Sequence, residues 1–98
     1  MWVRIREVSF PVERTDAVIE HVRDTVVARS DGEGFRGYRL LVDRPNGAAL
    51  EVSYWASEHE ARADGTSGQT APESGNPVGV PGGAVVRTNY YELGIDAG

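Results

Sequence analysis

Two apolar runs, at residues 35–43 and 48–55, lie on either side of a turn that contains Pro45 and Gly47. Runs of this length, rich in β-branched and aromatic residues and separated by a Pro/Gly turn, are typical of a β-hairpin. This hairpin constrains the fold more than any other feature of the chain. Side chains alternate between the two faces of a strand, so the number of residues in the turn decides which side chains share a face.

The hairpin has two possible registers. A three-residue turn pairs Arg44 with Ala48, and one face then carries Tyr38, Leu40, Val42, Leu50, Val52 and Tyr54. An even turn gives the other grouping, in which one face carries Tyr38, Leu40, Val42, Glu51, Ser53 and Trp55. The pattern favours the three-residue turn because it separates apolar residues from mixed ones. Leu40 and Leu41 are adjacent and both apolar, however, which indicates that both faces are buried.

The residues before the hairpin supply one strand and one helix. Residues 2–10 alternate in the manner of a strand. Residues 14–29 follow the helical period, because Val18, Val22 and Val26 recur every four residues and share one face. The sequence therefore predicts a strand followed by a helix ahead of the hairpin.

The residues after the hairpin begin with a helix start. Ser57 and Glu60 form a Ser-x-x-Glu capping box, which predicts a short second helix. Residues 65–84 are rich in Gly, Pro and Ser, and we expect a long loop there, either a mobile lid or a broken helix. Residues 85–93 have the pattern of a last strand, and we expect a flexible tail over 94–98.

The order strand, helix, strand, strand, helix, strand is the α+β pattern of the ferredoxin-like split βαβ fold. We expect a single domain over residues 1–98, with a four-stranded antiparallel sheet in the order 4-1-3-2 and both helices on one face. In either register the other face still carries large apolar side chains. An apolar face of this size is normally an interface, so we expect a homodimer.

Composition excludes several classes of function. The chain has 98 residues, a net charge of -5 and no cysteine, so we expect no nucleic-acid or anionic-membrane surface, no disulfide and no thiolate metal site. It has no signal-peptide pattern and no apolar run of the roughly 20 residues that span a bilayer, so we expect a cytoplasmic protein. All ten basic residues are arginine, which indicates a GC-rich bacterial genome, unless it reflects chance in a short chain.

Three short motifs resemble the antibiotic-biosynthesis-monooxygenase superfamily: Gly-Phe-x-Gly-x-x-Leu-Leu at 34–41, Trp-x-Ser-Glu at 55–58 and Tyr-Tyr-Glu-Leu at 90–93. The resemblance covers residues 1 to about 64 and 85–93. It implies a dimeric α+β barrel in which each protomer has a pocket between its sheet and its helices. The activities that it implies include cofactor-free oxygenation of polycyclic aromatic polyketides, quinol oxidation and haem degradation.

Few site residues carry over from this resemblance. Trp55 matches the tryptophan that ends the third strand of the cofactor-free oxygenases, but Glu51 stands where they have an asparagine and Ala61 where they have a tyrosine. Haem-degrading relatives have an asparagine at the position of Arg6. They also have an axial histidine in the region that corresponds to 65–84, which contains no histidine here. We therefore expect neither haem degradation nor a cofactor.

The candidate pocket is built around the second and third strands. Tyr38 falls where the superfamily places a pocket aromatic, which favours the even register, and we adopt that register. Glu51, Ser53 and Trp55 share one face in either register. Glu51 could act as a general base on a phenol, and Trp55 could stack on a flat substrate. Arg6 could pair with Glu51 or anchor an acidic ligand. The alternative is that Trp55 fills the core, Glu51 pairs with an arginine and Arg6 lies at the surface.

The residues support one interpretation and one alternative. His21 and His59 lack the spacing of a metal site, so we expect no metal. We interpret the chain as a cofactor-independent monooxygenase that acts on a planar, oxygenated aromatic of the polyketide or quinol class. The candidate residues are Glu51 and Trp55 for catalysis, and Arg6, Tyr38 and Ser53 for substrate binding. The alternative is a non-catalytic small-molecule-binding or stress-associated domain of the same fold.

Overall fold

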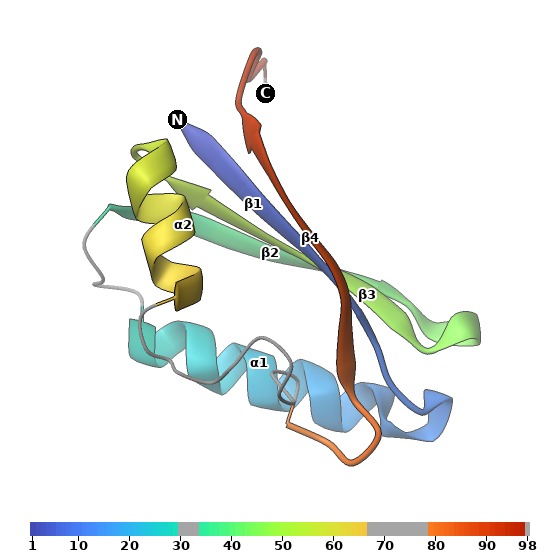
Figure 1. Ribbon diagram of the computed structural model, residues 1–98. Coiled ribbons are helices and arrows are strands. Elements are labelled where there is room, and N and C mark those ends of the chain that lie inside the picture. Colours follow the sequence, from blue (N-terminus) through green and yellow to red (C-terminus); the bar gives the residue numbers. More distant parts are fainter. Residues whose placement is uncertain (30–33, 67–78, 98) are drawn as a thin grey trace.

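The computed structural model describes residues 1–29, 34–66 and 79–97 (Figure 1). Its elements are β1 (Trp2–Ser9), η1 (Val12–Arg14), α1 (Thr15–Arg29), β2 (Phe35–Asp43), η2 (Arg44–Asn46), β3 (Ala48–Trp55), α2 (Glu58–Thr66) and β4 (Ala84–Glu92). The strands form one four-stranded sheet in the order β2-β3-β1-β4, and every neighbouring pair is antiparallel. Both helices lie on one side of this sheet (Figure 1). The predicted ferredoxin-like α+β fold and its strand order are confirmed.

The core lies between α1 and the sheet. It comprises Val8, Phe10, Val18, Val22, Ala49 and Val80. Val18 and Val22 are one turn apart on α1, as the helical period predicted, and Val26 continues the stripe as a partly buried residue. Ala49 brings β3 into this core. Every residue of β3 in step with Ala49 therefore points toward the helices.

The hairpin has the even register, so the register adopted from the position of Tyr38 is confirmed, and the three-residue turn that the pattern alone favoured is wrong. Asp43 pairs with Ala48, so four residues form the turn. The turn is a short 3-10 helix that ends at Gly47, whose φ of 63° lies in the left-handed region that glycine adopts without strain. The amide of Phe10 donates to the Gly47 carbonyl at 2.9 Å, and a Cβ at Gly47 would collide with the Phe10 carbonyl. This turn and its contact with Phe10 accompany the even register, which the separation of apolar residues did not predict.

The even register leaves apolar side chains exposed on the face without helices. Leu41 and Leu50 lie opposite each other and are 52% and 37% exposed, and Tyr91 of β4 is 50% exposed. A groove of about 270 Å³ beside the two leucines is also lined by Glu7 and Asp43. The uncovered apolar face that the sequence predicted is therefore present.

Helix α2 starts at the predicted capping box. The amide of Glu60 donates to Ser57 Oγ at 3.2 Å, and Ser57 Oγ donates to the Glu60 carboxylate at 3.1 Å. The prediction of a long loop over 65–84 falls largely on residues 67–78, which lie outside the described part of the chain. Residues 93–97 form neither helix nor strand.

Candidate functional site

Strand β3 presents a carboxylate, a hydroxyl and an indole to the helices. Glu51, Ser53 and Trp55 are in step with Ala49, which packs in the core with α1. All three are buried, and Glu51 is 6% and Trp55 4% exposed. The expectation that these three side chains share the helix-facing side of the sheet is confirmed.

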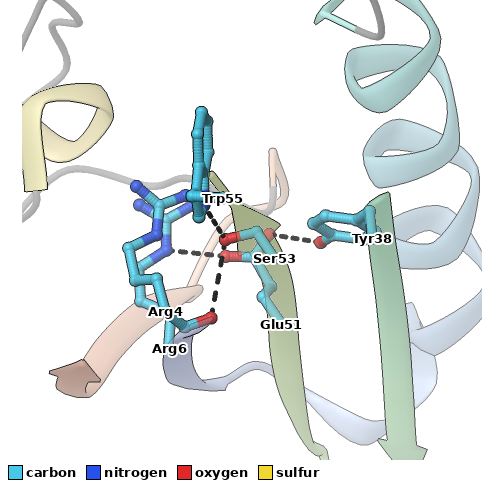
Figure 2. A network of polar contacts seen from close by, with 6 residues as sticks. All are labelled: Arg4, Arg6, Tyr38, Glu51, Ser53 and Trp55. Carbon is cyan, nitrogen blue, oxygen red and sulfur yellow. Dashed lines mark hydrogen bonds and ion pairs between the residues drawn. The ribbon is translucent and has the colours of Figure 1, made fainter. Parts of the chain in front are cut away.

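The carboxylate of Glu51 is held by two neighbouring strands. Arg6 lies opposite Glu51 on β1, and its Nε donates to Glu51 Oε1 at 2.7 Å. Tyr38 of β2 donates from its hydroxyl to Glu51 Oε2 at 2.8 Å, as Figure 2 shows. Arg6 and Glu51 form a mostly buried ion pair, which is one of the two roles considered for Arg6. The non-functional alternative also expected Glu51 to pair with an arginine and Trp55 to be buried in the core. Removing either charge would break a mostly buried ion pair, which is costly.

A second group of contacts surrounds the indole of Trp55. Its Nε1 donates to Ser53 Oγ at 2.9 Å, and Ser53 Oγ lies 3.5 Å from the carbonyl oxygen of Arg4 (Figure 2). The guanidinium of Arg4 lies 5.8 Å from the centre of the indole ring. Phe35 meets Trp55 edge to face, with ring centres 5.4 Å apart. Together, the hydrogen bond, the cation–π contact and the edge-to-face contact fix the orientation of the indole.

The sequence interpretation missed Arg4 and Phe35. Arg4 and Arg6 are two residues apart on β1, so strand alternation places both on the same face, and this signal was available. Phe35 lies at the start of β2, where a register shift between Phe35 and Gly37 interrupts the alternation. Alternation alone therefore gives no reliable face for Phe35.

Tyr38 is a phenol that stays protonated. Burial, followed by the negative charge and hydrogen bond of Glu51, raises the pKa of Tyr38 well above its ordinary value, and the charges of Arg6 and Arg4 oppose this more weakly. Tyr38 therefore acts as a hydrogen-bond donor to Glu51 across the neutral pH range.

This shift predicts a specific response to alkali. The folded state favours the neutral phenol of Tyr38, so its contribution to stability is fully present below the pKa of an unfolded tyrosine, about 10, and is lost as the pH rises above that value. In an ultraviolet titration, the absorbance step that accompanies alkaline unfolding should be larger in the wild type than in Tyr38→Phe by one tyrosinate. Equal steps in the two proteins would show that Tyr38 ionises in the folded state.

In the part of the chain that the structure describes, Tyr38 lines a groove and a smaller inner cavity. A groove of about 280 Å³ between α1 and β2 is lined by Ile19, Val22, Arg23, Val26, Val27, Tyr38, Arg39 and Leu40. An inner cavity of about 10 Å³ is lined by Arg4, Val26, Phe35, Tyr38, Ser53 and Trp55. The inner cavity has room for about one water molecule, whereas the groove approaches the size of small-ligand pockets. Val26 and Tyr38 line both spaces, and Trp55 lines only the inner one of the two.

Neither a cluster of metal ligands nor a membrane-spanning helix occurs in the part of the chain that the structure describes. Within residues 1–29, 34–66 and 79–97, no group of three or more His, Cys, Asp or Glu side chains is placed to hold a metal ion. Among the helices that the structure describes, none is long and apolar enough to cross a membrane.

Comparison with known proteins gives structural neighbours only. No protein-family model and no curated protein sequence matches the chain. A heme-degrading protein of Mycobacterium tuberculosis, in a heme-free form, superimposes with a TM-score of 0.71 at 17% identity, covering 99% of this chain and 98% of that chain. The same heme degrader, MhuD, with two hemes bound, gives 0.66 at 21% identity and 100% of both chains.

A third neighbour comes from another bacterium. A Deinococcus radiodurans protein described as a "putative antibiotic biosynthesis monooxygenase" gives a TM-score of 0.66 at 14% identity, covering 100% of this chain and 97% of that chain. At these identities the likeness shows the fold, and this chain has the α+β fold of these proteins. The resemblance indicated by the sequence motifs is confirmed at that level.

Proposed function

We propose that this chain is a cofactor-independent monooxygenase of the antibiotic-biosynthesis-monooxygenase type, acting on a planar, oxygenated aromatic of the polyketide or quinol class. The observation that carries the proposal is the buried carboxylate of Glu51, which is paired with Arg6 and bonded to the phenol of Tyr38. A phenolic oxygen thus already lies at hydrogen-bond distance from a carboxylate. In this proposal Glu51 is the base, Arg6 stabilises negative charge, Tyr38 and Trp55 are aromatic walls, and Ser53 is a polar contact.

The chemistry can be followed on an anthrone. Removal of a proton from its CH₂ group gives a carbanion that is electron-rich enough to reduce O₂ directly. A hydroperoxide forms at that carbon, and loss of water leaves a carbonyl group. One oxygen atom stays in the product and the other leaves as water, and the substrate supplies all the electrons. The protein therefore has to bind, deprotonate and orient the substrate, which are tasks for acid–base and apolar side chains.

The groove between α1 and β2 has mostly apolar walls, with Arg23 and Arg39 also in its lining. Its walls include Val22 and Val26 of α1, and Tyr38 lies on its β2 side. Its volume of about 280 Å³ is at the lower end of ligand pockets, which favours a compact ring system. One structural neighbour is described with two hemes bound, so heme should be included as a competing ligand in binding tests. Arg6, and the lack of histidine at 65–84, still argue against heme degradation.

A second candidate function is binding without catalysis. Glu51 and Ala61 stand where the resembled oxygenases have an asparagine and a tyrosine, and the buried Ala61 brings no polar group to the site. These two departures favour a small-molecule-binding or stress-associated role for the same fold.

Oxygen consumption and ligand binding, measured together, test both functions. The wild-type protein should bind an anthrone or a quinol and consume oxygen without any added cofactor. Binding without oxygen consumption would favour the non-catalytic binding function over the enzyme. If heme alone binds, the proposed ligand class is wrong, and if nothing binds, the likeness extends to the fold alone.

We also propose that the protein is a bacterial, cytoplasmic homodimer, formed through the sheet face without helices. The exposed Leu41, Leu50 and Tyr91 on that face support this. Light scattering should give about twice the 10.6 kDa of one chain, and Leu41→Asp should shift the dimer toward the monomer. Val12→Asp, at an exposed valine of η1, is the control and should leave the mass unchanged. A monomer at micromolar concentration would contradict the proposal.

A further inference from the structure

We infer that Tyr38 contacts the substrate directly and transfers a proton to Glu51. Glu51 accepts this proton from Tyr38 and does not itself contact the substrate. This inference rests on the proposed function and changes the way in which the base is reached. It makes Tyr38 a catalytic residue rather than an aromatic wall only. Glu51 is then the final proton acceptor without touching the substrate.

The first observation is the position of Tyr38. Its side chain lines the groove of about 280 Å³ between α1 and β2, and it also lines the inner cavity of about 10 Å³. Glu51 lines neither of these two spaces and is 6% exposed. A ligand that occupies the groove therefore lies against Tyr38, and the hydroxyl of Tyr38 is bonded to the carboxylate of Glu51.

The second observation is the state of the carboxylate. Glu51 Oε1 accepts from Arg6 at 2.7 Å, and Oε2 accepts from Tyr38 at 2.8 Å. A substrate hydroxyl that approached Glu51 directly would have to displace one of these donors. Displacing Arg6 would separate a mostly buried ion pair, and displacing Tyr38 would require its ring to move out of the packed face of β2.

The relay conserves protons and charge. The substrate donates the proton of an O–H or acidic C–H group to the Tyr38 oxygen as Tyr38 donates its own proton to Glu51 Oε2. The O–H or C–H bond of the substrate breaks, a new O–H bond forms on Tyr38, and Glu51 becomes a neutral acid. The negative charge moves from Glu51 to the substrate. Because burial and Glu51 keep the pKa of Tyr38 high, the phenol serves as a proton carrier and not as a stored phenolate.

Alizarin, a flat dihydroxyanthraquinone whose colour reports ionisation of its hydroxyl, is a direct probe of this relay. At a pH below its solution pKa, alizarin bound to the wild type should show an ionised fraction above that of free alizarin. Tyr38→Phe and Glu51→Gln should both lose this excess while still binding the dye. Tyr91→Phe removes the same hydroxyl from a tyrosine on the opposite face of the sheet, where we propose the dimer contact, and should keep the higher ionised fraction.

The outcomes separate the relay from the proposed function. The relay is wrong if bound alizarin keeps its higher ionised fraction in Tyr38→Phe and loses it in Glu51→Gln. Glu51 would then be a direct base. An excess that persists in both variants removes both residues from proton transfer. Failure of the wild type to bind alizarin, an anthrone or a quinol overturns the proposed function, and the relay with it.

If Tyr38→Phe does not fold, a measurement on the wild type can still test the relay. Near-ultraviolet circular dichroism will show whether the variant keeps its packed core. If it does not, the rate of oxygen consumption in mixtures of H₂O and D₂O decides the question. With a quinol as the substrate, whose O–H proton exchanges with solvent, the relay moves two exchangeable protons in one step, so the rate should fall along a curve as the deuterium fraction rises. A straight line indicates a single moving proton and overturns the relay.

Discussion

Glu51→Gln should lower the turnover of an anthrone or quinol by about 10²- to 10⁴-fold while changing ligand affinity little. The amide has nearly the shape of the carboxylate but cannot take up a proton at neutral pH. Its carbonyl oxygen can still accept from Arg6, and its NH₂ group can donate to the Tyr38 oxygen. The variant loses the buried ion pair with Arg6 and should be less stable, but the shape of the side chain is kept, so in the folded protein the loss of turnover should fall on kcat. Oxygen consumption at saturating substrate, together with a binding titration, measures the two quantities separately.

Glu58→Gln is the matched control for this substitution. Glu58 lies on α2, where it pairs with Arg62 at 2.9 Å as an exposed neighbour one turn away. An exposed pair of this kind contributes little to stability, so turnover and affinity should both match the wild type. Full activity in Glu51→Gln would show that Glu51 is not the base. A large loss of affinity would instead mean that its charge holds the ligand.

The fold could be predicted because its signals are local and repeated. Alternation at 2–10, the valine stripe at 14–29 and the Ser57 capping box each mark one element, and the element order leaves few topologies. The hairpin register could not be read from the apolar pattern because both faces of the sheet carry apolar side chains. A four-residue turn closed by Gly47 accompanies the even register, and its contact with Phe10 joins residues that lie far apart in the sequence.

The sequence predicted which strand side chains lie together, apart from Arg4 and Phe35, but not which of them line the spaces beside α1. Strand alternation placed Glu51, Ser53 and Trp55 on one face, and the element order placed Arg6 beside Glu51. The arrangement of the spaces depends on how α1 packs over β2, and a sequence pattern does not define the distance between a helix and a sheet. Trp55 for this reason lines a cavity of about 10 Å³ instead of the larger groove.

Trp55→Ala should lower the free energy of unfolding by about 3–5 kcal/mol, the largest stability effect that we expect. Trp55 is 4% exposed, packs edge to face against Phe35 and donates to Ser53. Alanine would leave a cavity in place of the indole and remove the donor to a buried hydroxyl. Denaturant unfolding measures the loss. Trp2→Ala is the control, because Trp2 lies opposite Trp55 on β1 but is only partly buried, and its replacement should cost less.

Substitutions of Trp55 also test whether its indole stacks on the ligand or only fills the core. If a ligand stacks on the indole, Trp55→Ala should also weaken binding by roughly 1–3 kcal/mol, as expected for a buried aromatic anchor. A lower affinity in Trp55→Ala could also follow from a loosened core, so Trp55→Phe is the sharper variant. It keeps an aromatic ring against Phe35 and loses only the indole N–H and part of the ring area. Weaker binding in Trp55→Phe, without a matching loss of stability, would show that the ligand contacts Trp55. The inner cavity would then have to widen when the ligand binds. Unchanged binding with a clear loss of stability would make Trp55 a core residue and leave Tyr38 as the aromatic contact.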